Sequence, residues 1–223
     1  MTEYEIKLLG EQVALKNIFR NFMKTPSVRD RHYSFNTYYL DYADVFYFSG
    51  YSLRHRVGAQ EIGKAAGTEL KALKGEIDGV SARLEEGVRG DCILKNVFNL
   101  MSGEKYPKDA PQVAPESLKI EFATAVRRLE RRATVSLNGQ DYIIEAALDD
   151  ISYLRNEGAT GDGLLDCVLM PVKTEHELEF ELKGDVDPSI LPYFFDWVRT
   201  NCISDTPIEL TTRSKALRAR AFC

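Results

Sequence analysis

Two segments of the sequence place a charged side chain at every second position and end in lysine. EYEIK at residues 3–7 contains Glu3, Glu5 and Lys7, and ELEFELK repeats the pattern over residues 177–183. Successive side chains of a β-strand point to opposite faces, so each segment is predicted to be a strand with one charged face. Glutamate is not a favoured strand residue. Carboxylates gathered on one face suit hard divalent cations such as Mg²⁺ or Mn²⁺.

Basic side chains follow the same period on other segments. Arg54 and Arg56 lie in GYSLRHR, Lys71 in TELK, Arg83 in GVSARLE and Arg128 in an arginine-rich run. A solvated antiparallel sheet also alternates charge, but it tends to mix signs because like charges opposite one another destabilise a pair. The separation of acids and bases therefore favours polar faces inside a barrel. Burying charge requires matching partners, and a metal-bound polyphosphate would match both signs, since arginine suits phosphate oxygens.

The elements that must position these residues are mostly extended. Amphipathic or capped helices are predicted over residues 11–24, 91–101 and 187–201. Further strands are predicted over residues 31–41, 51–57, 68–74, 80–88, 119–137 and 140–149. Asn138-Gly139 is a strong hairpin signal. About eight strands suited to antiparallel pairing, with three or four helices, predict an α+β fold in which one sheet curls into a barrel.

Composition limits the function classes. The chain has 223 residues, which we interpret as one domain over residues 1–223, and its net charge of −5 gives no argument for nucleic acid or an anionic membrane. No apolar run approaches the length of a membrane span. The first strand begins at Glu3, so we expect no signal peptide. Four widely spaced cysteines are then expected as reduced thiols in a cytoplasmic protein.

Eight segments resemble, in order, the motifs of the CYTH superfamily, the triphosphate tunnel metalloenzymes. EYEIK resembles the signature ExExK; YYLDYAD, GYSLRHR and TELK resemble YYFDTPD, GxxLRIR and TLTLK. GVSARLE, IIEAALD, ELEFELK and SKALRA resemble GxxxRPE, IEIALD, ELELELK and SKAARG. ExExK alone is a weak motif, whereas eight ordered matches along nearly the whole chain are strong together. A signature in the first residues is typical of the bacterial inorganic triphosphatases.

The resemblance implies an eight-stranded antiparallel tunnel, covered outside by helices, that binds a triphosphate lengthwise. One or two ions of Mg²⁺ or Mn²⁺ would be held by the carboxylates of Glu3, Glu5, Asp149 and some of Glu177, Glu179 and Glu181. The phosphate chain would be bound by Lys7, Arg54, Arg56, Lys71, Arg83, Arg128 and Lys215. Catalysis would depend on Glu5, Lys7, Arg56 and Glu85, with Glu85 either orienting basic residues or contributing to a second metal site. A metal-activated water would attack a terminal phosphorus in line.

Some assignments within the motifs are choices between neighbours. Period two favours Arg128 among the arginines of residues 127–132, and the match to TLTLK favours Lys71 over Lys74. Leu84 stands where the family motif has proline. This departure leaves the details of a second metal site open.

Three functions fit the pattern. The leading hypothesis is metal-dependent cleavage of inorganic triphosphate to pyrophosphate and phosphate. A second hypothesis keeps the site but changes the reaction to hydrolysis of thiamine triphosphate or a nucleoside triphosphate, or to cyclisation of ATP. The cyclases of the family usually carry HF before ExExK, whereas Met1-Thr2 precedes the motif here. A third is a non-catalytic polyphosphate-binding module. In each case the expected partner is a triphosphate-containing small molecule, bound by a monomer or homodimer without nucleic acid or membrane.

Overall fold

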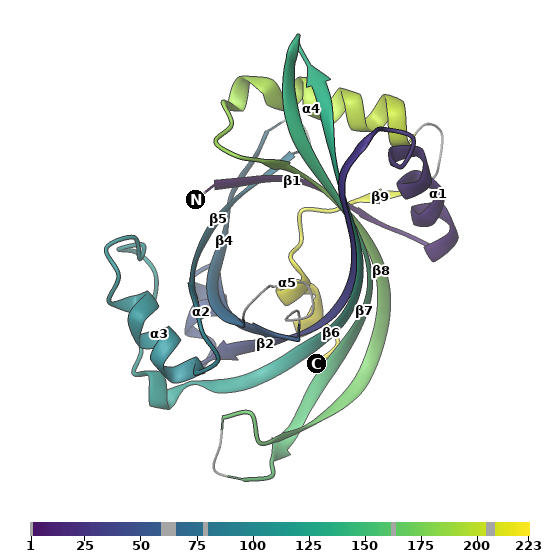
Figure 1. The fold of residues 1–223 in the computed structure, drawn as a ribbon. Coiled ribbons are helices and arrows are strands. Elements are labelled where there is room, and N and C mark those ends of the chain that lie inside the picture. The colour runs from purple at the N-terminus through teal and green to yellow at the C-terminus, as the bar shows by residue number, and fades with distance from the viewer. Residues whose placement is uncertain (1, 59–65, 78–79, 162–163, 204–207) are drawn as a thin grey trace.

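The computed structural model describes residues 2–58, 66–77, 80–161, 164–203 and 208–223. The strands are β1 (Thr2–Leu9), β2 (Ser27–Asp41), β3 (Tyr51–Val57), β4 (Gly67–Ile77), β5 (Val80–Arg89), β6 (Lys119–Leu137), β7 (Gln140–Ala159), β8 (Cys167–Lys183) and β9 (Glu209–Leu210). They pair in the order β5-β4-β3-β2-β6-β7-β8-β1-β9. Antiparallel pairing of β1 with β5 closes the first eight into a barrel, seen down its opening in Figure 1. The predicted eight-stranded antiparallel α+β fold is confirmed, and β9 is a short additional strand.

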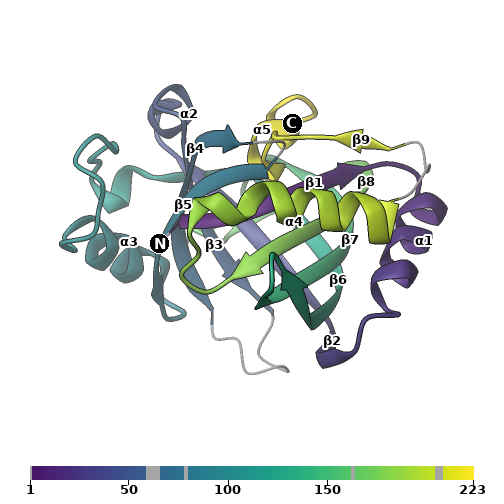
Figure 2. The same cartoon turned by 90° about the horizontal axis from the view of Figure 1, so that it is seen from above.

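The helices are α1 (Gln12–Phe22), α2 (Val45–Phe48), α3 (Ile93–Met101), α4 (Leu191–Val198) and α5 (Lys215–Arg220). Short 3₁₀ turns lie at Pro115–Ser117 and Pro188–Ile190, and a π-turn lies at Arg199–Ile203. Helices α1 and α4 lie on the outside of the barrel (Figures 1 and 2). Helix α5 projects inside the ring of strands in Figure 1, and Figure 2 places it at one end of the barrel, near β9. The last motif of the sequence therefore lies at this end of the barrel, and its Lys215 lines the cavity.

Strand register places many of the acidic and basic side chains directly opposite one another. Directly opposite residues on neighbouring strands carry opposite charges in the pairs Glu3–Arg83, Lys7–Glu179, Arg54–Glu69, Lys71–Glu85, Arg128–Asp149 and Arg132–Glu145. Opposite charges at such positions stabilise a strand pair, and like charges destabilise it. Other opposite pairs carry like charge, namely Glu5–Glu181, Glu145–Glu181 and Asp149–Glu177. The neighbouring strands β7, β8 and β1 therefore present mainly acidic faces, and β6 and β5 on either side of them contribute Arg128 and Arg83.

The apolar faces of the strands point outward beneath the helices. Around α1 and α4, the barrel contributes Ile6 and Phe180, and Phe22 packs edge-on against Trp197 at 6.1 Å between ring centroids. A second cluster lies beneath α3 and includes Leu53 from β3. Burial of these faces is the main force that turns the charged faces inward.

The buried side of α3 differs in part from what its sequence predicts. Helical spacing predicts Leu94, Val97, Phe98 and Met101 on the apolar side. Val97 is buried, but Leu94 and Phe98 are 41% and 63% exposed, and Ile93 and Leu100 are buried instead. Asp91 would be a good N-cap, but the helix begins at Ile93 with Cys92 at the N-cap position. The side-chain amide of the buried Asn96 donates a hydrogen bond of 2.6 Å to the Gly90 carbonyl, which helps to hold the face of α3 that carries Asn96 inward.

The hairpin between β6 and β7 is confirmed, with Asn138 and Gly139 at φ values of 47° and 78°. Strand β7 continues to Ala159, beyond the predicted end of this strand at residue 149. The connections between the predicted strands of residues 51–57, 68–74 and 80–88 lie partly outside the described residues. The four cysteines are unpaired. Among the described residues, no helix is both long and apolar enough to cross a membrane.

Candidate active site

The barrel encloses a cavity of about 520 Å³ whose walls are mainly charged. The acidic lining residues are Glu3, Glu5, Glu69, Glu85, Glu145, Glu179 and Glu181. The basic lining residues are Lys7, Arg54, Arg56, Lys71, Arg83, Arg89, Arg128, Arg132, Lys183 and Lys215. Basic residues outnumber acidic ones among these wall residues, so the cavity offers a surplus of positive charge for an anion.

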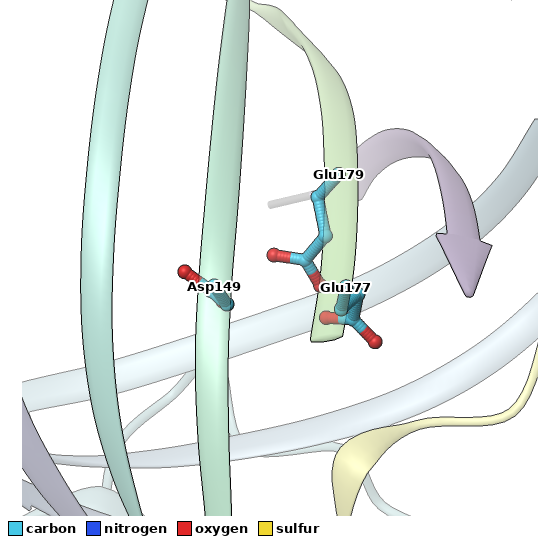
Figure 3. A group of neighbouring side chains, drawn as sticks. All are labelled: Asp149, Glu177 and Glu179. Atoms are coloured by element: carbon cyan, nitrogen blue, oxygen red, sulfur yellow. The ribbon is translucent and has the colours of Figure 1, made fainter. Parts of the chain in front are cut away.

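Three carboxylates meet at one place in the barrel. Asp149 on β7 and Glu177 and Glu179 on β8 offer oxygens that all lie within 4.8 Å of one another (Figure 3). Asp149 is directly opposite Glu177, and Glu179 is the next residue on the same face of β8. In the described part of the chain this is the one group of three potential metal-ligating residues at such spacing. We call it the carboxylate cluster.

Lys215 lies against all three members of the carboxylate cluster. Its Nζ is 3.3 Å from Asp149 Oδ2 and 3.1 Å from Glu179 Oε1, and it donates a hydrogen bond to Glu177 Oε1. Lys215 reaches this position because Ser214 caps α5, accepting a hydrogen bond from the Leu217 amide. The first turn of α5 therefore places an ammonium group among the carboxylates.

Two arginines neutralise Asp149 and Glu177, the two fully buried members of the carboxylate cluster. Arg128 donates from Nε and Nη2 to the two oxygens of Asp149 at 2.7 and 2.6 Å. Arg218 Nη2 donates to Glu177 Oε2 at 2.5 Å. Both carboxylates are completely buried. Such paired, hydrogen-bonded geometry is what makes buried charge tolerable.

Glu179 is ionised by its neighbours in spite of its burial. Burial raises the pKa of Glu179, but Lys215, Lys7 and Arg128 together hold that pKa well below its usual range. Lys7 donates to Glu179 Oε1 at 2.6 Å. The cluster therefore presents a charged oxygen to the cavity at neutral pH.

Glu5 lies beside the cluster and holds two cations. Its Oε2 is 2.5 Å from Lys7 Nζ, and its Oε1 contacts Arg83 Nε. Arg83 also donates from Nη2 to the Thr212 carbonyl at 2.6 Å, and burial lowers its pKa. Lys7 thus contacts both Glu5 and Glu179, although Glu5 is not a member of the carboxylate cluster.

Glu3 and Glu85 gather around Lys71. Lys71 Nζ donates to Glu3 Oε2 at 2.7 Å and contacts Glu85 Oε2. Burial raises the pKa of Glu3, but the Lys71 charge, hydrogen bonds with Glu85 and Lys71 and the Lys183 charge together lower that pKa to about 2. These carboxylates therefore form a second acidic region, apart from the cluster, with a lysine between them.

Arg54 and Arg56 are held on the cavity wall in different ways. Arg54 donates twice to Glu69 Oε2, at 2.9 and 2.7 Å. Burial raises the pKa of Glu69, but Arg54 and Arg56 lower it to about 2. The Arg56 guanidinium lies 4.6 Å from the ring centroid of Phe35, an attractive cation–π geometry.

Glu181 lies away from the carboxylate cluster and pairs with Lys183 at 2.6 Å. Burial raises the pKa of Glu181 to about 7, with only partial compensation by Lys183. Lys183 also lies 3.3 Å from Glu145. Among the three glutamates left open by sequence, the geometry brings Glu177 and Glu179 into the cluster and leaves Glu181 outside it.

The sequence reasoning named the motif positions but missed their direct partners. Glu69 is two residues before Lys71 and so shares its face, a signal that period two contained. Arg218 is three residues after Lys215, the spacing of helical neighbours, and reaches the carboxylate cluster with it. Glu145 and Lys183 also line the cavity without having been assigned to the site.

A smaller pocket of about 260 Å³ adjoins the cavity, and both are lined by Tyr39, Lys71 and Arg83. Its other lining residues are largely apolar and include Phe46 and Tyr47 of α2.

No protein-family model and no curated protein matches this sequence. Its structure is similar to that of HpAC1 from Hippeastrum, a proposed adenylyl cyclase with a dominant triphosphatase activity, at 17% identity and a TM-score of 0.59 over 98% of this chain and 95% of that chain. A proposed adenylate cyclase from Vibrio parahaemolyticus is also similar, at 12% identity and a TM-score of 0.51 over 99% of this chain and 98% of that chain. The PH1819 protein from Pyrococcus horikoshii is similar at 14% identity and a TM-score of 0.51 over 98% of each chain. At these identities the comparisons show a shared fold along nearly the whole chain.

Proposed function

We propose that this protein is a divalent-metal-dependent triphosphatase of the CYTH superfamily and that it hydrolyses inorganic triphosphate to pyrophosphate and phosphate. The observation that carries the proposal is a cavity with a surplus of basic side chains whose wall includes Glu179, a member of the carboxylate cluster. The fold shared with HpAC1, which has a dominant triphosphatase activity, supports it.

The carboxylate cluster fits Mg²⁺ or Mn²⁺ because both prefer oxygen ligands and Asp149, Glu177 and Glu179 supply them within 4.8 Å of one another. Glu3 and Glu5 remain candidates for a second position, as does Glu181. When bound, such an ion would neutralise phosphate charge and lower the pKa of a coordinated water.

The basic wall would bind and orient the phosphate chain. Arg56 is held over Phe35, and Arg54 is fixed by Glu69, so both guanidinium groups are positioned before substrate arrives. Fixed cations of this kind stabilise charge that develops as a phosphoanhydride bond breaks, without costly reorganisation. Water would attack a terminal phosphorus in line with the leaving oxygen, and the basic side chains would stabilise the departing pyrophosphate.

Within this scheme Glu5 positions Lys7 and Arg83, its two contacts in the barrel. Glu85 contacts Lys71 and would orient it toward the phosphate chain. Lys7 would bind phosphate beside the carboxylate cluster, since it donates to Glu179. These are the roles we assign to the strand-one signature and to the acidic residue of β5.

A second candidate substrate class is a triphosphate ester with an aromatic ring, such as a nucleoside triphosphate or thiamine triphosphate. The smaller pocket favours it, because Tyr47, Phe122 and Leu217 offer apolar surface next to the phosphate-binding wall. Glu121 also lines this pocket and would accept a hydrogen bond from an amino group. Inorganic triphosphate has no group that would fill this pocket.

Phosphate release from inorganic triphosphate, ATP and thiamine triphosphate, each with Mg²⁺ or Mn²⁺, tests the proposal. Glu5→Gln is expected to lower kcat on the order of 100-fold, because the cations it positions would lose their fixed geometry. Glu104→Gln, at an exposed position, serves as the matched control. Turnover unaffected by EDTA or by Glu5→Gln would refute the mechanism, and binding of triphosphate without turnover would identify a binding module instead.

A further inference from the structure

The ammonium group of Lys215 lies where a metal ion would have to bind. It is within 3.3 Å of Asp149 Oδ2 and 3.1 Å of Glu179 Oε1 and is hydrogen-bonded to Glu177. A divalent ion would need the same oxygens at about 2.0–2.6 Å. The two cations cannot share that position, because their mutual repulsion would add to the steric conflict.

Helix α5 is held in the barrel independently of Lys215. Arg218 is bonded to Glu177 and, through Nη1, to the Arg213 carbonyl at 2.8 Å. Arg220 donates to Asp41 Oδ2 at 2.9 Å. These contacts lie farther along α5 than Lys215, whose side chain also lines the cavity. The lysine side chain, with four rotatable methylene groups, can therefore move while the helix stays in place.

We propose that Lys215 is an internal counter-ion that a divalent metal displaces from the carboxylate cluster. The released ammonium group then turns into the cavity and binds the phosphate chain. The inference rests on the metal site of the proposed function, but it does not depend on turnover. It deepens that function by making metal binding and phosphate binding share one lysine.

Sharing a lysine couples the two ligands in a defined direction. Metal binding frees a phosphate-binding cation, and phosphate binding draws that cation away from the carboxylates. By linkage, each ligand raises the affinity for the other by the same factor. In the absence of phosphate, by contrast, Lys215 competes with the metal and weakens its binding.

Mn²⁺ binding to the full chain without phosphate, measured by calorimetry and electron paramagnetic resonance, tests the competition. Lys215→Met is expected to bind Mn²⁺ at least about 10-fold more tightly than the natural protein, since a hydrogen bond between charged groups no longer has to be broken. Lys183→Met is the matched control: it removes the same charge from the cavity, and in the described part of the chain its ion pairs are with Glu181 and Glu145. We expect less than a threefold change there. Equal or weaker binding in Lys215→Met, or the same gain in both variants, would overturn the proposal.

A measurement on the natural sequence covers the case in which Lys215→Met does not fold. With ¹⁵N-labelled lysine side chains, saturating Mg²⁺ is expected to shift the Lys215 ammonium resonance, assigned with Lys215→Arg, and to leave that of Lys183 nearly unchanged. An unshifted Lys215 signal on a metal-loaded protein would refute displacement. Mn²⁺ binding with the expected difference but no phosphate release would refute the triphosphatase proposal and leave the counter-ion role standing.

Discussion

Replacing Arg218 with methionine tests how strongly the buried charge network stabilises the barrel. Arg218 is 6% exposed and donates from Nη2 to the fully buried Glu177 at 2.5 Å. Its Nε lies 3.1 Å from Tyr153 Oη. Methionine keeps much of the apolar bulk but removes the charge, which leaves Lys215 to neutralise the Glu177 carboxylate.

The expected loss follows from two opposing contributions. Unit charges 2.5 Å apart attract by about 7 kcal/mol at an effective dielectric constant near 20. Removing the guanidinium also recovers the cost of burying it, so breaking a buried pair typically costs about 3–5 kcal/mol net. For a chain of this size that loss lowers Tm by roughly 10 °C. It is a large part of the total stability of about 5–15 kcal/mol that is usual for folded proteins.

Urea unfolding, followed by tryptophan fluorescence in EDTA, measures the loss. Trp197 is the one tryptophan of the sequence and packs on the barrel beside Phe22, so it reports global unfolding. Arg213→Met, at an exposed position, is the control and is expected to change the unfolding free energy by less than about 0.5 kcal/mol. A loss below about 1 kcal/mol in Arg218→Met would refute the reasoning. The double variant Arg218→Met/Glu177→Gln should lose less unfolding free energy than the sum of the losses in the two single variants, because the two side chains interact directly.

Two further predictions concern residues outside the cavity. Burial lowers the pKa of His55, which bonds Thr68 Oγ1 at 2.9 Å. The contribution of His55 to stability is therefore fully present above pH 6.5 and is lost as pH falls. Chemical denaturation at several pH values should show an unfolding free energy that falls with pH by at most about 1.4 kcal/mol per pH unit, and His55→Asn should reduce this slope. Arg131 is buried and donates hydrogen bonds of 3.0 and 2.7 Å to two backbone carbonyls that follow α1. Arg131→Met should therefore lower the unfolding free energy by about 2–4 kcal/mol, whereas Arg127→Met, at an exposed position, should change it little. Equal losses in the two variants, measured by calorimetry, would contradict this.

The sequence determined which side chains face the interior. A strand alternates its faces strictly, so choosing the charged face of each segment placed Glu5, Arg54 and Arg128 in one cavity. Local turn chemistry was also readable, since Asn138-Gly139 adopts the positive φ values that its hairpin requires. Both features depend on neighbouring residues alone.

Only the tertiary structure decided which charges meet. The three-carboxylate cluster depends on the stagger of β7 against β8, which puts Asp149 opposite Glu177 and leaves Glu181 opposite Glu145. That stagger is set by packing across the whole barrel, and no single strand encodes it. The entry of α5 is likewise non-local, because Lys215 and Glu177 are 38 residues apart in the chain. Alternation in the sequence therefore specified an inward charged face, and closure of the barrel specified the partners of each charge.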